Sequence, residues 1–294
     1  MKKHRLAARR LVAGVAAVVA LGLVAAGCGG DSSDDDNPGK GASGDLRVLL
    51  NAQPATLDPF VGSRSGQVVW GTVIEPLVAT DENLDPAETG IITSWTRDDP
   101  TTWTFKMRPG LTFTNGEKAD AAAVAETLLT TRDAEGSILK GYFANMTSAE
   151  ATDDTTIVVK TKLPQYDIPN LLCTVYFVPP AYYKEKGSAG FAAAPIGTGP
   201  YTFASSQAGR DIVVKKNPDY WGDKAANDQI TFTWSTEAAQ RLALLQSKSV
   251  DIALDLPPAQ AETAKDDGAQ CRLERLRHQD HRLPAVGQGA AGRS

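Results

Sequence analysis

The chain has 294 residues, 42% of them hydrophobic and 22% charged, which is enough for one large domain or two small ones. This composition excludes a chain that is disordered throughout, and three cysteines are too few for a disulfide framework. The formal charge of -5 makes nucleic acid and anionic lipid poor partners, because both repel an acidic protein.

Residues 1–27 have the pattern of an export signal. Five basic residues precede an uncharged apolar run of 16 residues from Leu11 to Ala26, which is short for a membrane span. Removing this segment takes away no acidic residue and leaves a formal charge of -10. Because of Arg9-Arg10, export by the twin-arginine pathway stays an alternative to the general secretory pathway.

The end of this segment, Ala25-Ala26-Gly27-Cys28, resembles the bacterial lipobox, although Ala25 stands where leucine is common. The resemblance predicts that Cys28 receives a diacylglycerol and anchors the protein to the extracytoplasmic face of the cell membrane. A plain secretory signal cut near Gly27 is the alternative. Residues 28–44 are rich in Gly, Ser, Asp and Asn, which predicts a disordered tether.

The first ordered element is expected at Leu46 to Leu50, an apolar strand. Trp103, Phe105 and Met107 alternate with polar residues and predict a half-buried strand. Turn dipeptides such as Asn115-Gly116 follow it. Asp120 is then expected to cap a helix over 121–132, in which three side chains face inward, namely Val124, Leu128 and Leu129.

Further strands are predicted at 155–162, 212–214 and 230–234. Thr236 is expected to cap a helix through Ser247, with Glu237 in its first turn, and a final strand is expected over 250–256. Strands and helices mix without a regular period. The fold class is therefore predicted to be α/β, in a mixed α+β arrangement.

This sequence offers few combinations of residues that could form a catalytic site. The three histidines, His4, His278 and His281, all lie outside residues 45–270, so this body has no imidazole base or imidazole metal ligand. Gly197-Thr198-Gly199-Pro200 lacks the lysine of a phosphate-binding loop. We therefore expect that the protein is not an enzyme and binds no metal or cofactor. Two alternatives stay open: a pair of carboxylates that acts as acid and base, and tryptophans that stack on a ligand.

Four segments in order resemble solute-binding protein family 5, the oligopeptide-, dipeptide- and nickel-binding proteins of ABC importers. They are Thr56 to Pro59 with Ile74 to Val78, Trp103 to Glu117 leading into the predicted helix, Pro195 to Tyr201, and Asn217 to Gly222 with Val250 to Ile252. The resemblance implies a periplasmic-binding-protein-like fold of two lobes. It places 45–60 and 195–270 in domain I and 61–194 in domain II.

The resemblance also implies a function and a site. The chain would deliver peptides or similar small solutes to ABC importer permease subunits, and the solute would lie nearest to Phe60, Arg64, Thr198 and Gly199. A direct nickel site is not expected in a body without histidine. The alternative is a short surface lipoprotein that acts as a protein-interaction module.

Residues 271–294 change character abruptly, with five arginines in 24 residues and a formal charge of +3. We interpret them as an aberrant, frameshifted or spliced-on tail, with a genuine basic end as the alternative. Because family members are longer, the third domain is expected to be largely missing. A half-built cleft buries little of a peptide, so impaired binding is expected.

Overall fold

A computed structural model describes residues 44–266 of the chain. The predicted signal (1–27), Cys28, almost all of the tether (28–44) and the basic tail (271–294) lie outside the described residues.

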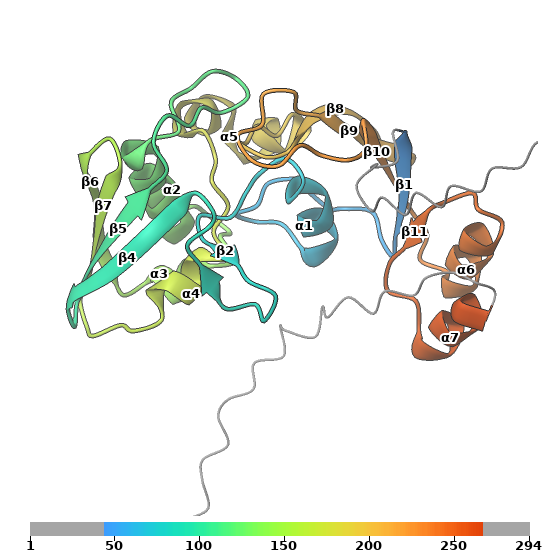
Figure 1. The fold of residues 1–294 in the computed structure, drawn as a ribbon, viewed down its shortest axis with the longest axis horizontal. Coiled ribbons are helices and arrows are strands. Elements are labelled where there is room, and N and C mark those ends of the chain that lie inside the picture. The colour runs from blue at the N-terminus through green and yellow to red at the C-terminus, as the bar shows by residue number, and fades with distance from the viewer. Residues whose placement is uncertain (1–43, 267–294) are drawn as a thin grey trace, which may run out of the picture. The chain divides into compact units, whose positions relative to one another are not determined.

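The first sheet has five strands in the order β11-β1-β10-β9-β8 (Figure 1). Their bounds are Ile252–Ala253 for β11, Asp45–Leu50 for β1, Gln229–Trp234 for β10, Asp211–Lys216 for β9 and Tyr201–Gln207 for β8. β1 runs parallel to both β10 and β11, whereas β9 pairs antiparallel with β10 and β8. The predicted strands at 46–50, 212–214 and 230–234 are confirmed.

The second sheet has four antiparallel strands in the order β4-β5-β7-β6. Their bounds are Ile92–Asp99 for β4, Thr102–Met107 for β5, Thr156–Thr161 for β7 and Met146–Asp153 for β6. In β5 the side chains of Trp103, Phe105 and Met107 are buried, as their alternation predicts. The predicted strand at 155–162 is confirmed as β7.

Helix α2 (Ala121–Asp133) packs against β6 and β7 of the second sheet. Asp120 caps it as predicted, accepting a hydrogen bond of 3.1 Å from the backbone N–H of Ala123. Val124 and Leu128 are buried, and Leu129 is half-buried against the same core.

The remaining elements are short. They are α1 (Arg64–Trp70), β2 (Ala79–Thr80), β3 (Pro86–Ala87), α3 (Lys140–Phe143), α4 (Ile168–Leu172), α5 (Pro180–Ala193), α6 (Ala238–Gln246) and α7 (Pro258–Asp266). Strands β2 and β3 form a small hairpin of their own. The mixed α/β class is confirmed by this set of elements.

Two predictions near the end of the described chain are wrong. Helix α6 begins at Ala238 after Glu237 as N-cap, and no side chain caps it. The backbone carbonyl of Thr236 accepts a hydrogen bond from Arg241. The strand expected over 250–256 is only the two residues of β11. Asp255 adopts a left-handed φ of 53°, which turns the chain away from the sheet before α7.

Buried apolar side chains form two clusters, one on each sheet. The chain passes from the first-sheet cluster to the second-sheet cluster between Ile74 and Leu77, and returns between Phe177 and Val178. Helix α1 therefore packs with the first sheet. The predicted domain division, with boundaries after residues 60 and 194, stays a prediction, because shared packing does not by itself define a domain.

Candidate functional site

The ends of the parallel strands lie together at one edge of the first sheet, which we call the carboxyl edge. Here β1 ends at Leu50, β10 at Trp234 and β11 at Ala253, and the N–H of Ser235 donates to the carbonyl of Leu50 at 3.0 Å. Ligands of open α/β sheets bind beyond the carboxyl ends of the strands. The loop 51–63, which follows β1, is therefore the first candidate for a binding surface.

A buried aspartate holds this loop from within. Asp58 is fully buried, and its carboxylate accepts hydrogen bonds of 2.9 Å from the N–H of Phe60 and from the hydroxyl of Tyr183. Burial raises the pKa of Tyr183 and the nearby Asp58 charge raises it further, so the phenol stays a donor. The Asp58-Pro59 pair is thus part of a fixed turn.

Two predicted site residues lie on this loop or directly after it. Phe60 is only 2% exposed, and its ring packs edge-on against Tyr183 with a centroid distance of 5.0 Å. Its carbonyl accepts a hydrogen bond of 2.9 Å from the N–H of Ile138, which brings the loop after α2 to the same place. Arg64 is the first residue of α1. Contact of either residue with a solute stays a prediction.

Helix α1 carries a second part of this surface. The side-chain amide of Gln67 donates to the hydroxyl of Tyr176 at 2.9 Å, and the Tyr176 ring stands edge-on to Trp70 at 6.1 Å. Burial raises the pKa of Tyr176. No sequence signal pointed to Gln67 or Tyr176, because 109 residues separate them.

Arg241 fixes the carboxyl edge from α6. Its side chain is 4% exposed and donates to the carbonyls of Ser235 at 2.8 Å, Thr236 at 3.0 Å and Asp255 at 2.9 Å. These carbonyls follow β10 and β11, so one guanidinium ties the two strand exits together. An arginine is suited to this role because its planar donors reach several acceptors at once.

The other two predicted site residues lie elsewhere, against the segment that follows α1. The N–H of Gly199 donates to the carbonyl of Val73 at 2.9 Å, and a side chain at Gly199 would meet the backbone of Val73. Thr198 is 3% exposed, and its hydroxyl donates to Glu75 at 2.7 Å. The structure therefore places Thr198 and Gly199 against residues 73–75, and their contact with a solute stays a prediction.

Glu75 is the centre of a hydrogen-bond cluster that joins three segments of the chain. Besides Thr198, its carboxylate accepts from the hydroxyl of Tyr220 at 2.7 Å and from the indole N–H of Trp221 at 2.9 Å. Burial raises the pKa of Glu75, although these donors partly offset the effect. The sequence drew attention to the segments that hold Glu75 and Trp221, but nothing in it showed that they meet.

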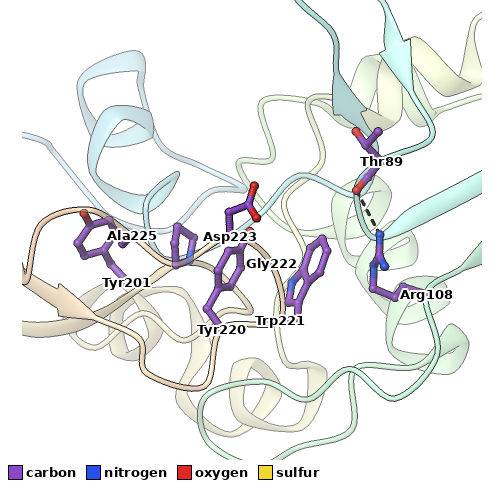
Figure 2. A pocket seen from close by; sticks show the side chains of 9 residues that line it. Thr89, Arg108, Tyr201, Tyr220, Trp221, Gly222, Asp223 and Ala225 are labelled. Atoms are coloured by element: carbon purple, nitrogen blue, oxygen red, sulfur yellow. Dashed lines mark hydrogen bonds between the residues drawn. The ribbon is translucent and has the colours of Figure 1, made fainter. Parts of the chain in front are cut away.

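A cavity of about 720 Å³ lies beside this cluster (Figure 2). Tyr220 and Trp221 form one wall, and the guanidinium of Arg108 lies over the Trp221 ring at 4.4 Å. Within residues 44–266 no three or more His, Cys, Asp or Glu side chains are grouped as a metal site would require. No helix in this range has the length and apolar character needed to cross a membrane.

Comparisons with known proteins agree with this geometry. The family model for bacterial extracellular solute-binding proteins, family 5 (middle part), matches residues 74–278. Protein XP55 of Streptomyces lividans is 30% identical over 288 residues, covering 95% of this chain and 52% of XP55. The glutathione-binding protein GsiB of Escherichia coli K12 is 30% identical over 227 residues, covering 75% of this chain and 44% of GsiB.

Among solved structures, the periplasmic binding protein AgaA from A. tumefaciens R10, in complex with agropinic acid, is similar with a TM-score of 0.69 and 27% identity. The similarity covers 76% of this chain and 45% of AgaA. The chain thus spans about half the length of the relatives that it matches. The predicted periplasmic-binding-protein-like fold is confirmed, and the chain belongs to family 5 of the bacterial extracellular solute-binding proteins.

Proposed function

We propose that the chain serves as an extracytoplasmic solute-binding lipoprotein that delivers a peptide or a similar small solute to the permease subunits of an ABC importer. Family membership supports the general role, and the similarity to GsiB, a glutathione-binding protein, supports a small peptide-like solute. Agropinic acid in AgaA is a second example of a small solute in a related fold.

The observation that carries the proposal is the carboxyl edge. Its loop is fixed by buried Asp58, its strand exits are tied by buried Arg241, and the loop after α2 adjoins it through Ile138. Binding sites need such preorganised walls, because ordering loose segments on binding costs affinity. The edge supplies a surface of this kind.

Solute-dependent thermal stabilisation tests the proposal. The protein would be heated with glutathione, with peptides of two to five residues and with agropinic acid. At 100-fold excess over Kd, one bound solute stabilises by about 2.7 kcal/mol, which raises Tm by roughly 5–10 °C. If no solute shifts Tm, the proposed function is wrong, and the result favours the alternative of a protein-interaction module. A Kd below micromolar would instead contradict the expectation that binding by this chain is impaired.

A matched pair of variants localises the solute. Ile138 and Leu163 are both apolar and exposed, at 56% and 63%, and only Ile138 adjoins the loop that carries Phe60. Ile138→Asp is expected to reduce solute stabilisation, because it places a charge beside the proposed wall, whereas Leu163→Asp is expected to leave it unchanged. Equal effects of the two variants would exclude the carboxyl edge as the site.

The membrane anchor is a separate part of the proposal, carried by the Ala25 to Cys28 run of the sequence. Cys28→Ala is expected to abolish lipidation and to release the protein or leave it unprocessed. Mass spectrometry of the mature N-terminus measures this directly. Cys173→Ala is the control, because Cys173 is half-buried within the fold and should leave lipidation intact. An unmodified Cys28 in the parent protein would contradict the anchor.

A further inference from the structure

The cavity of about 720 Å³ lies at the opposite end of the first sheet from the carboxyl edge. Tyr201, which lines it, begins β8 and pairs with Lys216 at the end of β9, and Gln229 at the start of β10 pairs with Lys215. Residues 220–223 and Ala225, which also line it, precede β10. We call this place the amino-edge cavity; a ligand bound there would be separate from a solute at the carboxyl edge.

The amino-edge cavity contains one cation with free donor capacity. Arg108 makes one hydrogen bond, from a terminal nitrogen to the carbonyl of Thr89 at 3.3 Å, and no carboxylate of residues 44–266 lies within ion-pair distance of it. Stacking on Trp221 fixes the plane of the guanidinium. The Nε of Arg108 is buried without a partner, and its terminal nitrogens keep spare N–H groups. A fixed guanidinium of this kind is suited to a carboxylate, which terminal N–H groups can bind through two parallel hydrogen bonds.

The cavity also contains one anion. Asp223 is exposed and forms no hydrogen bond or ion pair with any residue that the structure describes. Figure 2 shows Trp221 between Asp223 and Arg108, with Tyr220 beside Asp223. The aromatic wall is held by Glu75, which accepts from both Tyr220 and Trp221. Opposite charges thus flank a rigid aromatic surface.

We propose that the amino-edge cavity is a second binding site, specific for small zwitterions of the α-amino-acid type. The carboxylate of the ligand pairs with Arg108 and its ammonium group with Asp223, across the wall of Tyr220 and Trp221. A simple anion is disfavoured by Asp223 and Glu75, and a simple cation by Arg108, because like charges at a binding surface suppress the wrong partner. Only a ligand with both charges satisfies both groups.

Three probes and the indole signal of Trp221 test the site. The full chain, labelled with nitrogen-15, would be titrated with L-alanine, N-acetyl-L-alanine and L-alaninamide, and the Trp221 signal among the five tryptophans would be assigned with Trp221→Phe. L-alanine is expected to shift this signal saturably. Each analogue lacks one charge and is expected to bind about tenfold more weakly, as the loss of one charged hydrogen bond implies.

Matched variants test whether the charges of Asp223 and Arg108 are responsible for L-alanine binding. Asp223→Asn and Arg108→Gln are each expected to weaken L-alanine binding about tenfold. Asp219→Asn, an exposed aspartate of the same loop, and Arg97→Gln, an arginine stacked on Tyr166 at 4.4 Å, are the controls and should bind as the parent does.

Several results would overturn the proposal. They are an unmoved Trp221 signal at tens of millimolar L-alanine, equal binding of the three probes, and parent-like binding by Asp223→Asn. Asp223 is exposed, so this variant folds even if Arg108→Gln does not. Ile138→Asp, at the carboxyl edge, should leave L-alanine binding intact; a loss there would place the amino acid at the proposed solute surface instead.

Discussion

Gly199→Ala is expected to destabilise the protein by about 3 kcal/mol or more, as severe overpacking does. A β-carbon at this position would lie 2.6 Å from the carbonyl oxygen of Val73 and 2.9 Å from that of Thr72. Both atoms are backbone, so no side chain can rotate to relieve the clash. Moving the segment away would break the hydrogen bond from Gly199 to Val73. Urea unfolding followed by circular dichroism measures the loss.

Three further variants make this prediction specific. Gly197→Ala would also clash with the backbone of Val73 and is expected to be similarly harmful, and the double variant should cost less than the sum, because one displacement relieves both clashes. Gly141→Ala is the control: nothing lies within 4 Å of its added carbon, and alanine favours helix α3. A Gly199→Ala protein as stable as Gly141→Ala would show that the contact between Gly199 and Val73 is loosely packed.

Glu75→Ala is expected to lower the free energy of unfolding by about 3 kcal/mol, since it leaves three donors without their acceptor. These donors are the hydroxyls of Thr198 and Tyr220 and the indole N–H of Trp221. Glu88→Ala removes an exposed glutamate and should change stability by less than about 0.5 kcal/mol. Equal losses in the two variants would mean that the cluster adds nothing to stability.

Glu75→Gln separates hydrogen bonding from charge. The glutamine carbonyl can accept from Thr198 and Trp221 together, and its amide can donate to the oxygen of Tyr220, so a smaller loss of about 1 kcal/mol is expected. Trp221 is the wall of the amino-edge cavity as well as a donor to Glu75. Zwitterion binding should therefore survive in Glu75→Gln better than in Glu75→Ala.

The same pair predicts a pH dependence. Burial raises the pKa of Glu75 above its usual 4.5, so the folded chain keeps this proton to a higher pH than the unfolded chain does. The stability that this proton contributes is complete at pH values below the pKa of Glu75 in the unfolded chain. It is lost as the pH rises through the higher pKa of Glu75 in the folded chain. Glutamine does not titrate. The stability difference between the parent and Glu75→Gln should therefore shrink as the pH rises through this window, and a constant or growing difference would refute the assignment.

Local features of this protein were readable from the sequence because neighbouring residues decide them. The alternation of Trp103, Phe105 and Met107 determined a strand with one buried face, and Asp120 determined where helix α2 begins. The order of four short segments was enough to indicate the family, since each segment is a local turn or strand.

Tertiary structure decided the contacts that build the sites. Glu75 and Tyr220 are 145 residues apart, and no local pattern shows that a carboxylate will meet a particular phenol. The start of α6 was misjudged by one residue, since Glu237 and not Thr236 is its N-cap. The family resemblance implied that Phe60 lies near a solute, and only the folded chain shows that Phe60 is buried and packs against Tyr183; its contact with a solute stays a prediction. Burial depends on what the rest of the chain places over a residue, and only the folded chain determines that.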